Sequence, residues 1–317
     1  MRNSGLAVAL KAAISAALIG WLLHRTDIAP VAARFEQTDI VLAVAAIAVM
    51  MGQLLATAWR WQLIGRIMDV PLGGGETVRL TLIGQFFSQT LPSAIGGDAV
   101  RAWALARRGV PAGKAAGSVL ADRGIALLVL IGLVGATWPL LHVRVPDPAL
   151  RGAVAALVVG TGCGLGLFLA FQARLSIILG RVRALRPLAA ITKDIACILT
   201  RVRAIVPIVA VSVAVHLGVI ASAWLLALAV AIDVSFLDCL VLVPPIVLVT
   251  TLPISIGGWG VREGAAVLAF GFVGVPAADA LALSVAFGLT QIAVGLPGGA
   301  LWLSRGRSPS MPSPPGP

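Results

Sequence analysis

Charged side chains are scarce in this sequence. Asp, Glu, Lys and Arg make up 12% of the 317 residues, whereas hydrophobic residues make up 59%. Soluble domains carry roughly 45–50% apolar and about 25% charged residues, so this composition excludes an ordinary soluble globular protein. Apolar runs of about 20 residues, long enough to cross a hydrocarbon core of ~30 Å, recur along the chain. We therefore expect an all-α polytopic membrane protein.

Cysteine and histidine are also few. Cys163, Cys197 and Cys239 show no CxxC spacing, and because two of them lie in apolar runs they are interpreted as small buried hydrophobic residues. The three histidines are isolated; for His216, within a membrane segment, lining a cavity is the less favoured interpretation. No Ser-His-Asp, HExxH or P-loop pattern occurs. The sequence thus predicts no metal site, no cofactor and no enzyme activity.

Acidic residues are outnumbered: 13 Asp and Glu oppose 24 Lys and Arg, which gives a net charge of +11. In a membrane protein this excess is typical of cytoplasmic loops beside the anionic inner leaflet, and it does not indicate a nucleic-acid partner. Seven cations gather in residues 173–204 with a single acid, Asp194, on an amphipathic background. We expect this segment to lie as an interfacial helix on the inner leaflet. A basic cytoplasmic linker is the alternative.

One motif occurs twice. Residues 90–101 read TLPSAIGGDAVR and residues 251–262 read TLPISIGGWGVR, at an offset of 161 residues and with eight of twelve positions identical. Apolar segments often resemble one another by chance, but shared Pro, Gly-Gly and Arg at one register do not arise that way. The pattern indicates an internal duplication.

Each copy of the motif interrupts a hydrophobic segment. Proline lacks a backbone donor and paired glycines favour a turn, so a helix should break there. Two short arms joined by such a break are typical of a re-entrant hairpin or a discontinuous helix. The residues expected at the breaks are Pro92, Pro253, Gly96, Gly97, Gly257 and Gly258.

The hydrophobic runs predict about eight transmembrane segments plus two re-entrant or broken-helix motifs in a pseudo-symmetric inverted repeat. We assign one membrane domain to residues 1–303, with repeat 1 at about 39–141 and repeat 2 at about 205–303, followed by a disordered cytoplasmic tail at 304–317. The expected segments are 5–23, 39–58, 77–91, a short arm ending at Arg108, 115–141, 149–171, 205–232, 236–252, 258–274 and 277–303.

Topology follows from the positive-inside bias. Placing residues 173–204 in the cytoplasm puts both termini there. This placement also puts Arg107 and Trp59-Arg60-Trp61 on the cytoplasmic side. We interpret Trp59-Arg60-Trp61 as an interfacial anchor at the end of the second span. The first motif then enters the membrane from the cytoplasm, and the second, three helices later, from the opposite side. Inverted repeats with broken helices near the midplane form the architecture of many secondary transporters.

The motifs carry the chemistry of an anion site. Gly-Gly just before a helical arm leaves N–H groups free to bind an anion at close range. Arg101 and Arg262, expected in the first turn of each arm, match a phosphate in bidentate fashion. Asp98 is expected to pair with Arg101 across one turn. Glu263, next to Arg262 in the sequence, is expected not to face it.

Six charged residues fall in or near membrane segments. At ~2.5–3.5 kcal/mol each near the bilayer centre, they would together cost on the order of 15–20 kcal/mol if unpaired, more than the ~5–15 kcal/mol stability of a typical protein. One interpretation is an ion-pair network that pins the two repeats together. The other, which we favour, is a polar cavity for a charged headgroup, shaped or gated by Asp98, Glu263, Asp122 and Arg123. The six residues are Asp98, Arg101, Asp122, Arg123, Arg262 and Glu263.

Four motifs stand in a fixed order: LPSAIGGDAVR at 91–101, ADR at 121–123, IGGWGVRE at 256–263 and LPGG at 296–299. Together they resemble the transmembrane-region family of lysylphosphatidylglycerol synthases, also called the flippase-like domain family. The resemblance implies a bacterial inner-membrane protein. Bifunctional members of that family move aminoacylated phosphatidylglycerol between leaflets, and others are linked to polyprenyl-phosphate sugars or hopanoid pathways. Their soluble aminoacyl-transferase domain is not expected here, because only a short tail follows Leu303.

The sequence therefore predicts a lipid flippase whose substrate is an anionic or zwitterionic phospholipid or a polyprenyl-phosphate carrier, with Arg101 and Arg262 holding the phosphate. An integral membrane enzyme acting on a lipid phosphate, with Asp98, Glu263 or Asp122 in a chemical role, is one alternative. A scaffold of a lipid-pathway complex, docking through residues 173–204, is the other.

Overall fold

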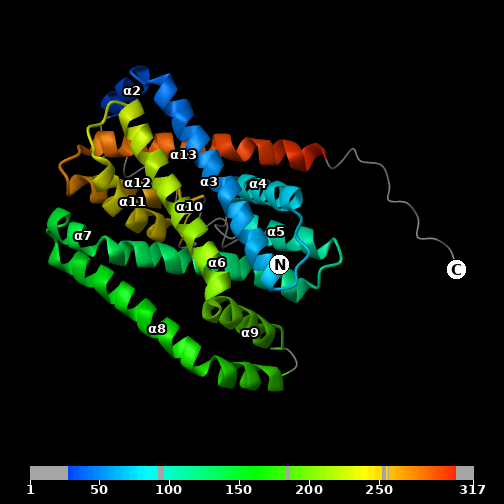
Figure 1. Ribbon diagram of the computed structural model, residues 1–317. Helices are drawn as coiled ribbons and strands as arrows, with labels where there is room; N and C mark the ends of the chain where they lie inside the picture. Colours follow the sequence, from blue (N-terminus) through cyan, green and yellow to red (C-terminus); the bar gives the residue numbers. More distant parts are fainter. Residues whose placement is uncertain (1–27, 92–95, 183–185, 252–254, 256, 305–317) are drawn as a thin grey trace, which may run out of the picture.

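The computed structural model describes residues 28–91, 96–182, 186–251, 255 and 257–304. Within these ranges every regular element is a helix and no strand occurs, which confirms the all-α fold (Figure 1). The helices are α2 (Ile28–Glu36), α3 (Ile40–Ile67), α4 (Gly74–Thr90), α5 (Gly96–Ala106), α6 (Ala112–Ala136), α7 (Trp138–Arg144), α8 (Pro148–Arg181), α9 (Arg186–Thr200), α10 (Val202–Ala229), α11 (Phe236–Thr250), α12 (Val261–Gly271) and α13 (Ala277–Leu303).

Five of the described helices, α3, α6, α8, α10 and α13, are long and apolar enough to cross a membrane. A sixth, α11, is apolar but shorter. This confirms a multi-pass helical membrane protein. The expected first span at 5–23, the helix-breaking Pro92 and Pro253, and the tail from 305 onward lie outside the described residues.

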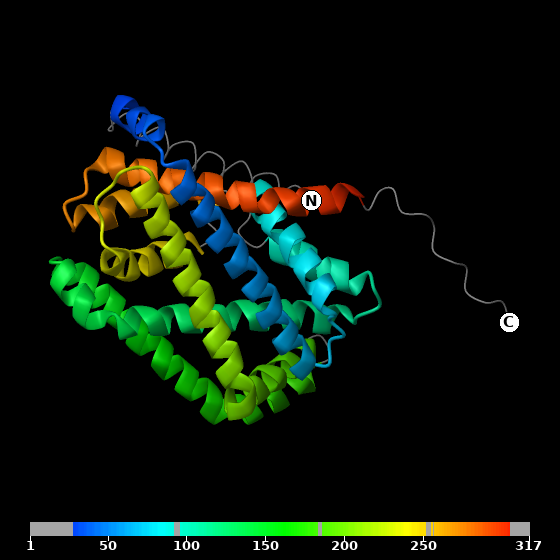
Figure 2. The ribbon, with the colours of Figure 1, turned by 45° about the horizontal axis from the view of Figure 1, so that its top comes forward.

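The order of helices repeats along the chain. Helices α3 and α10 each contain 28 residues, and α5 and α12, which follow the two motif copies, each contain 11. The paired helices run in opposite directions: α3 packs along an antiparallel α10, and α6 and α13 point opposite ways in both views (Figures 1 and 2). This is the arrangement that an inverted duplication predicts.

Local sequence explains where several helices begin. The Asp39 carboxylate accepts from the N–H groups of Val41 and Leu42 and starts α3. Asp147 does the same for α8, whose first residue is Pro148, and proline is favoured there because that position needs no backbone donor. Helix α11 begins with a capping box between Ser235 and Asp238.

Arg34 links helix α2 to the start of α13 and to the turn after α10. Arg34 makes two hydrogen bonds to the Asp279 carboxylate at the start of α13, at 2.8 and 2.7 Å, and a third to the Ala231 carbonyl at 2.8 Å. The backbone N–H of Asp39 adds a bond to the Ala229 carbonyl at 2.8 Å. These contacts join α2 and the start of α3 to the end of α10 and the start of α13.

Glycines allow α4 to approach its neighbours closely. A Cβ at Gly298 of α13 would lie 2.0 Å from the Leu82 carbonyl oxygen of α4, and a Cβ at Gly97 of α5 would lie 2.1 Å from the Gly84 carbonyl oxygen. Any larger residue at these positions would force the helix backbones apart. Helix α4 is thus held between an arm of its own repeat and the last helix of the other repeat.

Several predicted boundaries were wrong. The second span does not end at residue 58, because α3 continues to Ile67 and buries Arg60 and Trp61 inside the bundle instead of leaving them as an interfacial anchor. Arg60 is accommodated there because it meets a carboxylate of α6. The predicted helix at 115–141 is two helices, α6 and α7, and the break falls at Thr137, just before Pro139.

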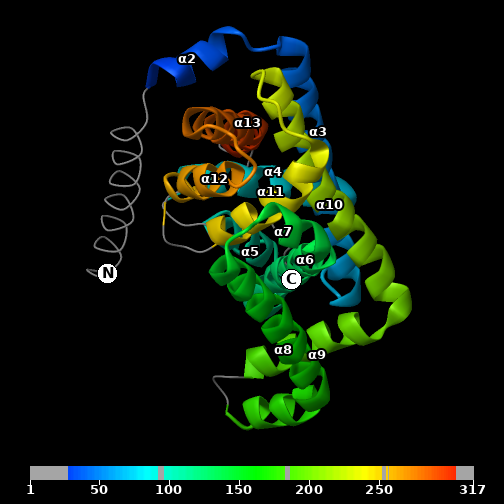
Figure 3. The ribbon, with the colours of Figure 1, turned by 90° about the vertical axis from the view of Figure 1, so that its left-hand side faces the viewer.

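The basic segment also differs from its prediction. The helix expected at 149–171 runs on to Arg181 as α8, so the interfacial stretch predicted at 173–204 contains the end of α8 and all of α9. Helices α8 and α9 pack against each other at the lower end of the molecule in Figure 3, and α9 also packs against α3, α6 and α10. The burial expected for the cysteines holds only for Cys239, since Cys197 is half-buried and Cys163 is exposed.

The tight crossing of α13 and α4 gives a test of this packing. Gly298→Ala should lower the melting temperature of the purified protein in detergent, because overpacking costs about 1–3 kcal/mol. Gly124→Ala on α6 is the matched control, since its Cβ would meet nothing within 4 Å and alanine has the better helix propensity. Equal melting temperatures for the two variants would contradict the crossing.

Candidate functional site

A cavity of about 640 Å³ lies at the centre of the bundle, between the two repeats. Helices α4, α5 and α6 of the first repeat and α10 to α13 of the second all contribute to its wall. Both motif copies reach it: Asp98 from the first, and Gly257, Gly258 and Arg262 from the second.

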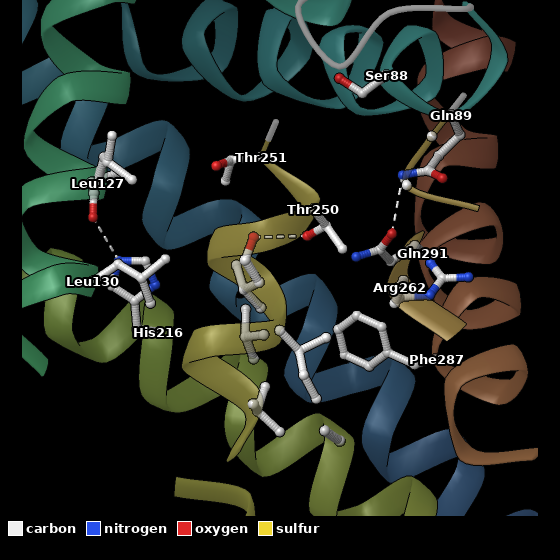
Figure 4. Close-up of a pocket in the computed structure, with 18 of the residues that line it drawn as sticks. Ser88, Gln89, Leu127, Leu130, His216, Thr250, Thr251, Arg262, Phe287 and Gln291 are labelled. Carbon is white, nitrogen blue, oxygen red and sulfur yellow. Dashed lines mark hydrogen bonds between the residues drawn. The ribbon is translucent and has the colours of Figure 1, made fainter. Parts of the chain in front are cut away.

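The cavity wall is divided into polar and apolar regions. Ser88 and Gln89 of α4 lie at the top in Figure 4, and Gln89 donates to Gln291 of α13 at 3.2 Å. Below them the wall becomes apolar around Leu130 and Phe287. The polar members are Gln85, Ser88, Gln89, Asp98, Arg123, His216, Thr250, Thr251, Arg262, Ser284 and Gln291. An amphipathic molecule with a compact polar end therefore fits the lining.

Five alternating charges connect α3, α6 and α5 and end at the cavity. Asp122 accepts from Arg60 Nε at 2.8 Å and from Arg101 Nη2 at 3.3 Å. Asp98 accepts from Arg101 Nη1 at 3.2 Å and from Arg123 Nε at 2.6 Å. We call this series, Arg60–Asp122–Arg101–Asp98–Arg123, the arginine–aspartate chain. All four carboxylate oxygens are occupied, as buried charges require.

The arginine–aspartate chain is buried except at its cavity end. The side chains of Arg60, Asp122 and Arg101 are 3%, 1% and 5% exposed, whereas that of Arg123 is 54% exposed. Arg101 stacks on the Trp61 ring, with its guanidinium carbon 3.9 Å from the ring centroid. A cation over an aromatic face is stabilised further when it is shielded from water. Arg101 is therefore an internal charge, and Arg123 is the one that reaches the cavity.

In the second motif copy, the buried arginine is paired with the carboxylate of the next residue in the sequence. Arg262 donates to Glu263 Oε1 from Nη2 at 2.7 Å and from Nε at 3.1 Å. Ser284 of α13 accepts from Arg262 Nε at 3.2 Å and donates to the same Glu263 oxygen at 3.1 Å. The Arg262 guanidinium carbon lies 4.5 Å from the centroid of the Trp259 ring. Each duplicated arginine thus stacks on a tryptophan and faces a carboxylate.

The expectation that Glu263 cannot face Arg262 was wrong. Glu263 is the third residue of α12, and its side chain turns back to accept from the Gly260 N–H in a capping box. In that position its other oxygen lies beside the Arg262 side chain, which turns across the start of the helix. The expected pair of Asp98 and Arg101 is present at 3.2 Å.

The predicted site residues do not all reach the cavity. Of the two phosphate-binding candidates, Arg262 lines the cavity and Arg101 does not. Arg101 also lies beyond the first turn of α5, which begins at Gly96, whereas Arg262 is the second residue of α12. The predicted cavity residues found on the wall are Asp98, Arg123, Gly257, Gly258 and Arg262, and those behind it are Arg101, Gly96, Gly97, Asp122 and Glu263.

The first pair of glycines has a packing role. Gly97 lies against Gly84 and Ser88 of α4, where a Cβ would come within 2.2 Å of the Ser88 hydroxyl oxygen. The second pair is different, because Gly257 and Gly258 both have positive φ, at 56° and 81°, and line the cavity. Positive φ is a conformation that glycine adopts without strain.

Sequence reasoning missed several residues of the site. Arg60 was assigned to the membrane interface, although a charge within an apolar run is itself a signal of burial with a partner. His216, the less favoured candidate, lines the cavity and has Nε2 3.0 Å from the Ala126 carbonyl oxygen. No sequence signal singles out the bond between Gln89 and Gln291, which are 202 residues apart.

No three His, Cys, Asp or Glu side chains in the described ranges converge as ligands for a metal ion. Absence of enzyme activity and of a cofactor stays a prediction.

The comparisons with known proteins identify one family. The sequence model of the lysylphosphatidylglycerol synthase TM region matches residues 8–299. No curated protein and no solved structure matches the chain at a significant level. The family description places the chain among membrane proteins of lipid-related processes.

The arginine–aspartate chain predicts unequal effects along its length. Asp122→Asn should lower the melting temperature in detergent strongly, since breaking a buried pair costs about 3–5 kcal/mol. Arg123→Gln should lower it less, because its side chain is half exposed. Adding Arg60→Gln to Asp122→Asn should restore part of the loss by removing one uncompensated cation. A double variant less stable than Asp122→Asn alone would argue against this pairing.

Proposed function

The chain belongs to the lysylphosphatidylglycerol synthase TM region family, and from this premise we propose that it is a flippase that moves a phosphate-bearing lipid between the leaflets of the bacterial inner membrane. The observation that carries the proposal is the central cavity, which combines charged and polar groups with an apolar wall. A lipid presents the same two chemistries to its binding site.

The physical need for such a cavity is the cost of moving a headgroup through hydrocarbon. An isolated charge in a medium of low dielectric constant is destabilised by many kcal/mol, and an unpaired polar group by several. Arg123 and Arg262 offer cationic donors at the cavity wall, and the glutamine and threonine side chains offer neutral partners. A headgroup inside the cavity would exchange water for these groups, while its chains remain against apolar surface.

We assign the phosphate to Arg123 and Arg262, in place of the Arg101 and Arg262 pair expected from the sequence. Arg101 already contacts two carboxylates and the Trp61 ring and is 5% exposed. Arg123 makes one hydrogen bond, through Nε, among the contacts of the described residues. Its two terminal nitrogens can therefore donate to a bound oxygen in the planar geometry that suits phosphate.

The basic segment is proposed to lie on the anionic inner leaflet. The exposed cations are Arg174, Arg181, Lys193, Arg201 and Arg203. Helix α9 packs on the bundle through Ala189, Ala196 and Ile198, and its Lys193 is exposed. Partial burial raises the pKa of Asp194, the acid within this segment, which Lys114 opposes. A surface of this kind is attracted to anionic lipid headgroups.

Transport is tested by filling the cavity from its exposed edge. Thr251 lines the cavity and is exposed, so Thr251→Trp should obstruct it without disturbing the core. In liposomes with a fluorescent phospholipid, the protein should speed exchange between leaflets, and Thr251→Trp should reduce the rate to that of protein-free liposomes. Leu289→Trp, at an exposed position of α13 outside the cavity, is the matched control. Identical rates with and without protein would refute the flippase.

Topology is tested separately by cysteine labelling. In a background lacking Cys163, Cys197 and Cys239, a cysteine at Arg107 should react only from the cytoplasmic side and one at Asp233 only from the outside. In Figure 1 the turn after α5, which holds Arg107, and the turn between α10 and α11, which holds Asp233, lie at opposite ends of the bundle. Labelling of both positions from one side would contradict cytoplasmic termini and the inverted arrangement.

A further inference from the structure

We propose that the cavity selects a lipid with one net negative charge, namely a phosphodiester whose headgroup carries hydroxyl groups and no ammonium group. This inference rests on the proposed function of the same cavity and names its substrate class. It follows from the charge balance and from the hydrogen-bonding groups left unused on the wall.

The charge balance comes from the two motif copies. In the arginine–aspartate chain, three arginines face two aspartates, so the series carries a net charge of +1. Arg262 and Glu263 cancel each other. The remaining polar residues of the described wall are glutamine, serine and threonine side chains and His216, which gives Nε2–H to the Ala126 carbonyl at 3.0 Å and is counted here as a neutral ring. The site therefore has one cation in excess.

The excess cation lies where a ligand can reach it. Both oxygens of Asp98 are already occupied, and the Arg123 side chain is 54% exposed at the cavity. A phosphodiester carries one negative charge and neutralises this excess. A phosphomonoester, with a charge of about −1.5 to −2 at neutral pH, exceeds it, and a zwitterion leaves it unneutralised. Such mismatches matter more in a cavity than in water, because screening is weaker there.

The neutral groups point to hydroxyls in the headgroup. Gln89 gives its amide hydrogen to Gln291, and its own carbonyl oxygen is buried without a partner among the described residues. The hydroxyl groups of Thr250 and Thr251 donate to the carbonyl oxygens of Val247 and Leu248, at 2.7 and 2.6 Å. Their own oxygens can therefore still accept hydrogen bonds. These three groups are acceptors that need donors, and the Gln291 amide group beside them keeps its own hydrogens to donate, so a partner that both donates and accepts suits the wall. Sugar or glycerol hydroxyls supply donors without adding a second positive charge beside Arg123.

The experiment measures binding of defined lipids to the purified full-length protein. Short-chain phosphatidylglycerol, phosphatidylethanolamine and phosphatidic acid are titrated in detergent, with the melting temperature as readout, since a ligand of the folded state raises it. We expect phosphatidylglycerol to bind at least about tenfold more tightly than the other two, a ratio equal to 1.4 kcal/mol. A polyprenyl phosphoglucose, also a phosphodiester, is compared with phosphatidylglycerol to decide whether the hydroxylated headgroup comes on a glycerolipid or on a polyprenyl carrier.

Charge variants make the test sharper. Arg123→Gln removes the excess charge and should move the preference to phosphatidylethanolamine. Asp98→Asn raises the charge to two and should move it to phosphatidic acid. Arg66→Gln is the matched control, because Arg66 is an exposed cation of α3 outside the cavity wall, and it should keep the original order. If Asp98→Asn does not fold, Arg123→Gln alone decides.

The outcomes separate this inference from the proposed function. Equal binding of the three lipids by the unmodified protein, or the same change of order in Arg66→Gln as in Arg123→Gln, overturns the charge selection. Transport without selection would leave the flippase standing and remove the substrate class. Selective binding of phosphodiesters by a protein that moves no lipid would uphold the selection and remove the flippase.

Discussion

The structure depends on the rule that a charge enclosed in an apolar bundle must meet an opposite charge. Asp122 meets this rule by contacting Arg60 of α3 and Arg101 of α5, which are far apart in the sequence. The bonds fix the rotation of α3, α5 and α6 relative to one another, since a turned helix would leave a buried charge unpaired. Ser212 of α10, 3.4 Å from Arg60 Nη1, brings the second repeat into the same network.

The two repeats satisfy the rule in different ways. In the first repeat, five charged residues on three helices form a series of ion pairs that ends at Arg123 on the cavity wall. In the second, Arg262 and Glu263 are adjacent and are joined by Ser284 of the last helix. Both arginines still stack on tryptophan, through Trp61 and Trp259. Both repeats therefore contain an arginine stacked on tryptophan. The charged residues of the first repeat carry a net positive charge and those of the second are balanced, so one side of the cavity is cationic.

Ion pairing and cavity formation are complementary here. The network interpretation describes Arg60, Asp122 and Arg101, which lie behind the wall, and the cavity interpretation describes Arg123 and Arg262, which line it. Backbone approach at Gly97 and Gly298 draws α5 and α13 onto α4, so its polar residues Ser88 and Gln89 face the centre. Packing thus places the polar side of one helix opposite the apolar sides of others.

The sequence by itself determined the membrane class and the duplication, because composition, apolar run length and a repeated motif can be read directly from the order of residues. It also predicted the bond between Asp98 and Arg101, which are separated by one helical turn. Only the tertiary structure decided that Arg60 is internal, that Arg101 lies behind the wall and that Arg123 faces the cavity. The partner of a buried charge is chosen by helices that meet from distant parts of the chain. Here the decisive contact joins residues 62 positions apart, and no local pattern of residues encodes it.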